Sequence, residues 1–299
     1  MVTGTNINKQ SNRGFELMVE YRPKIRNVQL SIMPTFTFTQ NKWDYFDEEV
    51  YTNPDDIRTK KRTGRSANLS FGYISDGLFM SQGEIDKHTF NQDGAGNTTL
   101  KPGDIRYVDV NGDGILDERD YDVIGKGTFP EVVYSLVMGA TYKGLSLEML
   151  WQGSTGFNFY VTGAAASMFS NESIPYDYHY TYRWQADPAN PTQNINPKAQ
   201  LPAASLGLNP NNIKRSDFWM KDATFIRLRN VNVSYSITGN WVKKVGIKNL
   251  QVFTSATNLL TFSRLGFYKN TFDPDANLSG EGRNYPIHKN IAGGVRLTF

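Results

Sequence analysis

Residues 135–152 read SLVMGATYKGLSLEMLWQ, and their pattern of apolar and polar residues indicates the class of fold. On each side of Lys143-Gly144, bulky apolar residues alternate with small or polar ones. The apolar positions are Leu136, Met138, Ala140 and Tyr142 before the turn, and Leu145, Leu147, Met149 and Trp151 after it. Neighbouring side chains of a strand point to opposite faces of its sheet. The stretch therefore predicts a hairpin with one apolar face and one polar face.

The same alternation recurs along the rest of the chain. It predicts further strands over residues 15–21, 28–38, 225–237, 250–256 and 291–299. No segment shows an apolar period of 3.6 over ten residues, which is the pattern of a helix. We therefore expect an all-β chain with about seven antiparallel strands.

The connections between these strands alternate in length. The segments 22–27, 143–144 and 238–249 are short, whereas 39–130, 153–217 and 258–290 far exceed the usual loop of about 4–6 residues. Strict alternation puts every long loop at the same end of the sheet. Outer-membrane barrels have this arrangement, with short periplasmic turns and long extracellular loops.

The composition excludes several classes of protein. The chain has 299 residues, 32 Lys and Arg against 29 Asp and Glu, and no Cys. It therefore has no disulfide and no thiolate metal site, and its balanced charge argues against a nucleic-acid partner. Its mean hydropathy of −0.49 and the lack of a long apolar run exclude a helical membrane protein. Residues 1–13 have neither a basic nor an apolar region, so we do not expect them to form a signal peptide.

A soluble β-sandwich is the main alternative for an alternating pattern. Aromatic residues near the expected strand ends favour a barrel instead, because barrels carry aromatic girdles at both membrane interfaces. The polar faces carry Asn, Ser, Gln, Glu and Arg, which suits a wet lumen. Seven strands cannot close a transmembrane barrel, so we expect the chain to be part of a larger one.

Several motifs, taken together, resemble one family. Residues 103–114 read GDIRYVDVNGDG, followed by Ile124-Gly125 and Pro130, and residues 222–231 read DATFIRLRNV. Shorter matches are YKGLSL at 142–147, WQG at 151–153, NLLT at 258–261, Asp273-Pro274, NYP at 284–286 and LTF at 297–299. In order and spacing they resemble SusC/RagA-type TonB-linked outer-membrane proteins over nearly the whole chain.

This resemblance implies a function and partners. It implies a 22-stranded barrel with an internal plug, energised through TonB, that imports oligosaccharides, peptides or similar nutrients across the outer membrane. It also implies a SusD-like surface lipoprotein as partner. Residues 1–299 match the C-terminal barrel portion alone, so the plug, the TonB-interacting segment and any N-terminal domain lie outside this sequence.

The GDIRYVDVNGDG stretch opens a candidate calcium loop. Oxygen ligands are spaced as in an EF-hand loop, at Asp109, Asn111, Asp113, Ile115 (through its carbonyl), Asp117 and Asp120. The loop departs from that pattern at its last position, where the shorter Asp120 replaces Glu. The spacing predicts a structural Ca²⁺ site, and the alternative is a loop closed by Asx turns.

The densest aromatic stretch covers residues 176–184. We expect it to bind substrate or a partner protein through Tyr178, Tyr180, Tyr182, Arg183 and Trp184. The alternative is that these side chains pack within the loops.

No arrangement of residues indicates catalysis, so we do not expect an enzyme. The three histidines, His88, His179 and His288, lie in expected loops without metal or triad spacing and are expected at the surface. A secreted calcium-binding β module for glycans or proteins is the alternative function. Phe299 favours the barrel, because a C-terminal aromatic residue resembles the assembly signal of outer-membrane barrels. Residues 241–245, WVKKV, are expected to anchor a turn at the membrane interface.

Overall fold

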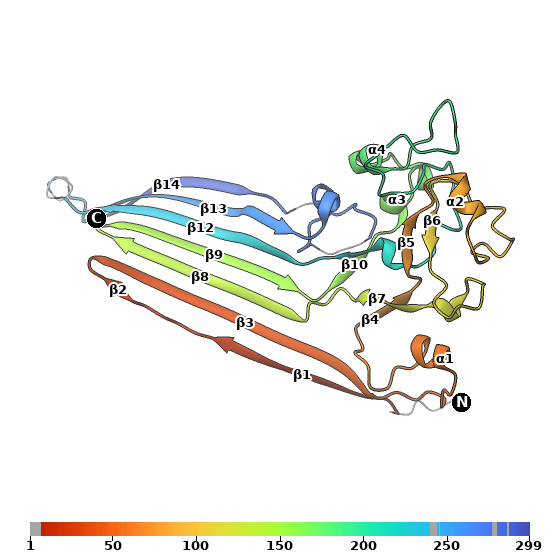
Figure 1. The fold of residues 1–299 in the computed structure, drawn as a ribbon. Coiled ribbons are helices and arrows are strands. Elements are labelled where there is room, and N and C mark those ends of the chain that lie inside the picture. The colour runs from red at the N-terminus through yellow and green to blue at the C-terminus, as the bar shows by residue number, and fades with distance from the viewer. Residues whose placement is uncertain (1–6, 240–243, 245, 277–279, 286) are drawn as a thin grey trace, which may run out of the picture.

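One antiparallel sheet dominates the computed structural model, which describes residues 7–239, 244, 246–276, 280–285 and 287–299 (Figure 1). Its strands pair in sequence order, β1-β3-β8-β9-β12-β13-β14, and the short β2 pairs with β3. Their bounds are β1 Lys9–Met18, β2 Lys24–Ile25, β3 Val28–Tyr45, β8 Val132–Tyr142, β9 Leu145–Thr155, β12 Phe225–Ile237, β13 Asn249–Ser263 and β14 Asn290–Thr298. The expected strand order is confirmed.

The hairpin that led the sequence argument forms as predicted. Lys143 and Gly144 have φ angles of 45° and 88°, the left-handed pair that a two-residue type I′ turn requires. Strands β1, β3 and β13 are longer than the apolar pattern predicts, because ladder hydrogen bonds continue through polar residues such as Asn41 and Lys42.

The strand register gathers most of the apolar residues of the seven long strands on one face of the sheet, with exceptions such as Val137, Leu150 and Phe253 on the other. Residues paired across an antiparallel ladder share a face, and the pairs are apolar on apolar. Examples are Phe15 with Phe38, Ile32 with Met138, Leu136 with Trp151, Leu147 with Val233, and Val252 with Val295. The opposite face carries hydroxyl, amide and charged groups, such as Thr35 with Ser135 at 2.6 Å.

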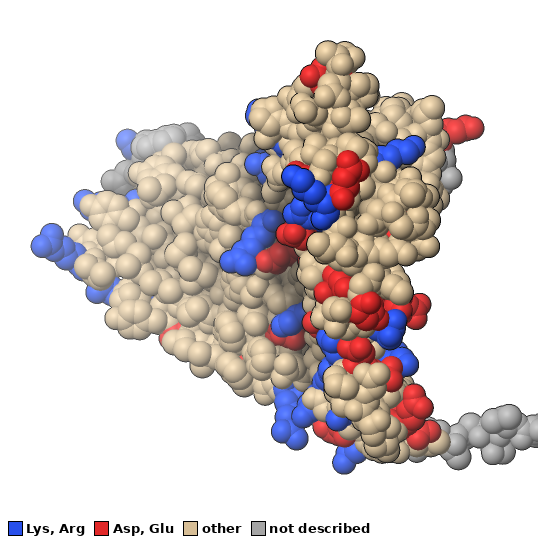
Figure 2. Space-filling view, turned by 45° about the vertical axis from the view of Figure 1, so that its right-hand side comes forward, with Lys and Arg blue, Asp and Glu red and all other residues tan. Residues whose placement is uncertain are grey.

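Exposed aromatic residues border the apolar face at both ends. Tyr21, Tyr142 and Tyr235 lie near the turns, and Phe15, Phe36 and Phe262 lie nearer the long loops. In Figure 2 the visible strand surface is largely uncharged, whereas acidic and basic side chains crowd the other part of the molecule. An apolar band with aromatic borders is the surface that a lipid bilayer requires.

A β-bulge between Leu228 and Asn230 changes the phase of β12. After the bulge, toward the turn that follows β12, the odd-numbered residues Val231 and Val233 face the apolar side. Before it, toward the loop layer, the even-numbered Ile226 and Leu228 face that side, opposite Phe262 and Leu260. The extra residue therefore places Arg227 on the polar face, where an unbroken alternation would have put it toward lipid.

All long connections lie at the same end of the sheet, as expected, and they fold together into what we call the loop layer, residues 46–131, 156–224 and 264–289 (Figure 1). Its strands are β4 Leu69–Gly72, β5 Ser75–Leu78, β6 Ile105–Tyr107, β7 Asp122–Lys126, β10 Asn158–Tyr160 and β11 Met220–Asp222. Its helical segments are α1 Pro54–Thr59, α2 Gln82–Asp86, η1 Glu118–Asp120, α3 Gly163–Ala166, η2 Ser170–Glu172, α4 Asp177–Tyr182, η3 Asp217–Trp219 and η4 Gly266–Asn270.

The main buried core lies in the loop layer, and Phe225 at the start of β12 is the sheet residue that joins it. All three long connections contribute to it: Tyr73, Ile105 and Tyr107 from the first, Phe159, Trp184 and Trp219 from the second, and Leu265, Tyr268 and Phe272 from the third. The loops are thus a packed layer held by apolar burial.

Among the described residues, no helix has both the length and the apolar character needed to cross a bilayer. Four of the five residues of the expected interfacial turn 241–245 lie outside the described residues.

Candidate functional site

The aromatic stretch singled out from the sequence forms α4 and its flanks. The helix is fixed at its start by His179, whose Nδ1 accepts a hydrogen bond from the backbone N–H of Tyr176 at 3.1 Å. The other ring nitrogen, Nε2, lies 3.1 Å from the carbonyl oxygen of Ala165. The two contacts together define a neutral ring that accepts at Nδ1 and donates at Nε2.

Burial keeps this histidine uncharged. His179 is 1% exposed, and burial lowers its pKa to about 4, against a smaller opposing effect of the Ala165 carbonyl. The expectation that His179 lies at the surface is therefore wrong: its ring is part of the framework that holds α4. His288 is exposed, as expected, and His88 is half-buried.

A pocket of about 650 Å³ opens between α4 and η4. Its aromatic wall is formed by Tyr182 and Phe267, whose rings stack at 4.5 Å and 21°, and by Tyr178, whose ring centre is 5.7 Å from that of Phe267. Polar groups complete the lining: Asp177, Thr181, Lys269, Asn270, Thr271 and Asn284. Flat rings beside hydrogen-bonding groups suit a sugar ring or a peptide side chain.

The five residues predicted to bind lie in three different environments. Tyr178 and Tyr182 line the pocket. Tyr180 is 55% exposed, and the guanidinium of Arg183 lies over its ring at 5.6 Å. Trp184 is buried in the core of the loop layer, and its Nε1 donates to the carbonyl oxygen of Met80 at 3.2 Å. Packing within the loops therefore accounts for Trp184 and also for Tyr178, which is 5% exposed and donates its hydroxyl to the carbonyl oxygen of Ala165. Tyr180, Tyr182 and Arg183 are exposed or half-buried and remain accessible to a ligand or partner.

Sequence reasoning missed an ion cluster beside this pocket. Arg227 donates to Asp273 at 2.6 Å and to Asp275 at 3.1 Å, and Arg229 also pairs with Asp275. A second pocket of about 320 Å³, lined in part by Arg227 and Asp273, shares Lys269, Asn270 and Thr271 with the first. The cluster ties the third long loop to β12 and forms part of the wall of the second pocket.

The candidate calcium loop is closed by hydrogen bonds to its own backbone. Asp109 accepts from the N–H groups of Gly112 and Gly114 at 2.7 and 2.8 Å, and Asp120 accepts from those of Val110 and Asp117 at 2.9 Å each. Asn111 and Asp113 accept in Asx turns from the N–H groups two residues on, and Arg119 pairs with Asp113 and Asp117. Ile115 is exposed.

No group of three or more His, Asp or Glu side chains is placed to hold a metal ion within the described ranges. The calcium site stays a prediction from the sequence spacing.

The GDIRY part of the motif has a structural role. Asp104 accepts hydrogen bonds from Asn209 at 2.6 Å and from Asn212 at 2.9 Å, and Asn212 in turn accepts from the N–H of Ile105. Burial raises the pKa of the Asp104 carboxyl, against these hydrogen bonds. The motif thus joins the first long connection to the second.

Phe299 follows β14 and is exposed. Its carbonyl oxygen accepts a hydrogen bond from Nζ of Lys248 at 3.1 Å, and the carbonyl of Thr298 accepts from the N–H of Lys248. Nothing in this arrangement bears on the predicted assembly signal.

Comparison with known proteins gives curated relatives over nearly the whole chain. TonB-dependent receptor P26 of Formosa agariphila is 25% identical over 98% of this chain and 30% of its own length. TonB-dependent receptor P3 of the same organism is 22% identical over 98% of this chain and 29% of its own. TonB-dependent receptor SusC of Bacteroides thetaiotaomicron is 22% identical over 99% of this chain and 28% of its own. The chain spans about 30% of the length of these relatives, and no family model matches it.

Solved structures show the same fold. The RagAB peptide transporter superimposes with a TM-score of 0.67 at 16% identity, over 98% of this chain and 29% of that one. The RagAB peptide importer in its open-open state gives 0.63 at 16% identity, with the same two shares.

The relationship to SusC/RagA-type TonB-dependent receptors is confirmed, and with it the expected antiparallel barrel strands and the outer-membrane location. The relatives are receptors and not enzymes, and they do not favour a secreted calcium-binding module.

Proposed function

We propose that this relative of SusC/RagA-type TonB-dependent receptors is the C-terminal part of the barrel of an outer-membrane transporter that imports oligosaccharides, peptides or similar nutrients. The observation that carries the proposal is the asymmetry of the sheet. One face is an apolar band with aromatic borders, the other is polar, and all long loops stand at one end.

Further strands are needed to complete the barrel. In the described part of the chain, β1 and β14 are edge strands, each with one side unpaired. An unpaired backbone group in lipid costs several kcal/mol, so both edges require partner strands in the membrane. The plug and the TonB-interacting segment belong, in this proposal, to the same larger protein outside residues 1–299, and the chain itself has no catalytic role.

The loop layer forms the outer mouth of the transporter. The pocket between α4 and η4 offers the ring of Tyr182 to the cargo, with the buried Tyr178 behind it. Tyr180 and Arg183 are not part of the pocket lining, and we assign them to the docking of a SusD-like lipoprotein. Aromatic and arginine side chains are the residue types that most often anchor such contacts. Any Ca²⁺ held at residues 109–120 would serve only to stiffen the loop.

The orientation can be tested by cysteine labelling in the complete receptor, because residues 1–299 contain no Cys. Val233→Cys and Asn232→Cys are neighbours on opposite faces of β12, and Tyr180→Cys lies on the loop layer. We expect a membrane-impermeant maleimide to label Tyr180→Cys in intact cells, a small water-soluble reagent to label Asn232→Cys, and only a lipid-soluble maleimide to label Val233→Cys.

Equal labelling of both β12 variants by aqueous reagents would contradict the membrane orientation, as would recovery of the complete protein in the soluble fraction. Transport itself is tested by comparing spent media. Strains lacking the receptor or TonB are expected to leave the same oligosaccharide or peptide unconsumed, and consumption by both strains would overturn the transport proposal.

A further inference from the structure

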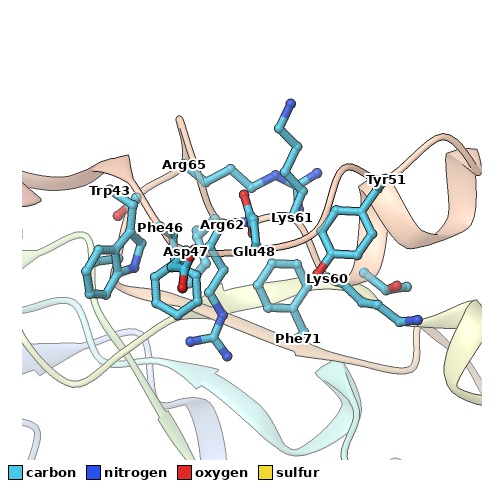
Figure 3. A pocket seen from close by; sticks show the side chains of 14 residues that line it. Trp43, Phe46, Asp47, Glu48, Tyr51, Lys60, Lys61, Arg62, Arg65 and Phe71 are labelled. Atoms are coloured by element: carbon cyan, nitrogen blue, oxygen red, sulfur yellow. The ribbon is translucent and has the colours of Figure 1, made fainter. Parts of the chain in front are cut away.

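A pocket of about 540 Å³ lies in the first long connection, between β3 and β4 and beside α1 (Figure 3). Trp43 of β3 is in phase with Thr35 and Thr37, which lie on the polar face of the sheet. The pocket is therefore at the lumen side of the loop layer, well away along the sheet from the pocket between α4 and η4. None of the sequence motifs points to it.

Four half-buried aromatic side chains line the pocket: Trp43, Phe46, Tyr51 and Phe71. Trp43 and Phe46 meet edge to face, with ring centres 5.0 Å apart and planes at 75°. Their remaining ring surface borders the open space, and Figure 3 shows the rings of Tyr51 and Phe71 on the other side of it. Partly exposed ring faces around a cavity suit a flat, ring-shaped ligand.

Cationic side chains surround these rings. The guanidinium of Arg62 lies 4.9 Å from the ring centre of Phe46, and that of Arg65 lies 5.8 Å from that of Phe71. Arg65 is fixed by the backbone carbonyls of Ile57 and Arg58, at 2.9 and 2.6 Å. Stacking on a ring holds a guanidinium in place and leaves its N–H edge available for an anion.

Three of the four cations make no ion pair. Lys60 pairs with Asp56 at 2.7 Å, but Lys61, Arg62 and Arg65 have no carboxylate within ion-pair distance in the described part of the chain, although the charge of Lys61 acts on Glu48. The carboxylate of Glu48, which also lines the pocket, accepts hydrogen bonds from the backbone N–H groups of Arg62 and Thr63, at 2.7 and 2.9 Å. Burial would raise the pKa of Glu48, but these hydrogen bonds lower it below its ordinary value, so Glu48 stays ionised and closes the loop.

The backbone around the pocket is already paired. Trp43 N–H donates to Arg65 at 2.9 Å, Gly64 N–H donates to Trp43 at 2.7 Å, and Ala67 N–H donates to Asn41 at 3.2 Å. An extended peptide is recognised chiefly through free strand edges. Between β3 and residues 64–67 these backbone groups are taken, and the lining offers side chains: ring faces, cations, and the polar groups of Asp47 and Ser66.

We propose that this pocket binds an acidic saccharide, a sugar ring that carries a carboxylate or a sulfate ester. The ring stacks on Trp43 and Phe46, its anionic group pairs with Arg62 and Lys61, and its hydroxyls bond to the polar lining. The proposal deepens the transport function above and rests on it, since the pocket then captures part of the cargo at the mouth of the barrel.

The test is binding to the purified complete receptor in detergent, measured by titration calorimetry. The probes are oligogalacturonate, chondroitin sulfate oligosaccharides, neutral maltoheptaose and a penta-glutamate peptide. We expect at least one acidic saccharide to bind, with an affinity that falls as salt rises, and at least tenfold weaker binding by the double variant Lys61→Gln, Arg62→Gln. Lys198→Gln, an exposed lysine elsewhere in the loop layer, should leave binding unchanged.

A second variant pair tests the rings. Trp43→Ala should weaken binding at least tenfold and Trp43→Phe much less, while thermal unfolding of each variant confirms that it is folded. The proposal is overturned if neither acidic saccharide binds, if maltoheptaose or the peptide binds as well as they do, or if the pocket variants bind like the parent.

The saccharide could be imported or could belong to the lipopolysaccharide of the same membrane. Lipopolysaccharide that displaces the bound oligosaccharide identifies the membrane as the source, and failure to displace it identifies an imported ligand. A receptor that labels as expected in the outer membrane and supports uptake, yet binds no acidic saccharide, refutes this inference alone.

Discussion

The guanidinium of Arg227 lies 2.6 Å from a carboxylate oxygen of Asp273, although 46 residues separate the two along the chain. Arg227 is 1% exposed, and its second carboxylate partner, Asp275, is 3.1 Å away. This pair joins a barrel strand to the third long loop at the point where both candidate pockets meet. It is a buried link between the sheet and the loop layer.

Removing the arginine should loosen that loop. Arg227→Met leaves Asp273 without its arginine and Asp275 with Arg229 alone. Removing one partner of a buried ion pair typically costs about 3–5 kcal/mol. We expect faster proteolysis of residues 264–289 in the membrane-embedded receptor and a lower midpoint for thermal unfolding of the barrel. Arg264→Met is the matched control, because Arg264 pairs with Asp222 at 3.1 Å but is 72% exposed, where such a pair is worth up to about 1 kcal/mol. Equal effects of the two substitutions would contradict the tethering role.

Burial of neutral His179 should make the loop layer sensitive to acid. The pKa of this histidine is about 4 in the folded protein, against about 6.5 in an unfolded chain. Between about pH 4 and pH 6.5 this histidine is protonated in the unfolded state but neutral in the folded state. The free energy of unfolding is therefore constant above about pH 6.5 and falls with acidification down to about pH 4. The slope is at most about 1.4 kcal/mol per pH unit.

Fluorescence of the buried Trp184 and Trp219 during denaturant unfolding provides the measurement. His179→Gln cannot take up the proton, so it should flatten the pH dependence, while His288→Gln, at an exposed position, should keep it. An unchanged slope in His179→Gln would show that another group is responsible.

Two glycines of the sheet should differ sharply in their tolerance of alanine. A Cβ at Gly153 would lie 2.4 Å from the carbonyl oxygen of Phe225 and 2.6 Å from the ring of Tyr134, which packs over it. At Gly293 the nearest atom would be 3.6 Å away. We expect Gly153→Ala to destabilise the barrel by about 1–3 kcal/mol, and Gly293→Ala to be neutral or slightly stabilising. Heat-dependent gel mobility of the folded barrel measures both, and similar midpoints would refute the packing argument.

The calcium prediction can be separated from its alternative through Arg119. This arginine pairs with Asp113 and Asp117, so Ca²⁺ would have to displace it. If the loop is a calcium site, Arg119→Ala should bind Ca²⁺ more tightly than the parent receptor in calorimetric titrations, and Asp109→Asn should bind it more weakly. Absence of calcium-dependent heat in all three proteins would favour the loop closed by its own hydrogen bonds.

The strands were predictable because their signal is local. Alternation fixes the face of each residue within a strand, and turn residues such as Lys143-Gly144 fix the hairpin, so strand order and loop placement follow from short windows of sequence. Strand ends were less predictable, because ladder hydrogen bonds run on through polar residues such as Asn41.

The site was less predictable because its contacts are distant in sequence. The bulge in β12 is visible in the sequence only as two arginines, Arg227 and Arg229, in phase with apolar Val231 and Val233. Charged residues at positions that should face lipid indicate that the alternation of the strand changes phase at that point. The partners Asp273 and Asp275, and the burial of His179 against Ala165, depend on how separate loops come together.

The location of the buried core has a consequence for biogenesis. Its residues come from three successive connections, for example Ile105, Trp219 and Tyr268, and they are buried against one another. The core can consolidate only after the hairpins stand in their correct order and register. A barrel inserted with a strand out of register would then leave the loop layer unpacked and open to proteases. Correct packing of the loop layer thus depends on correct assembly of the barrel strands.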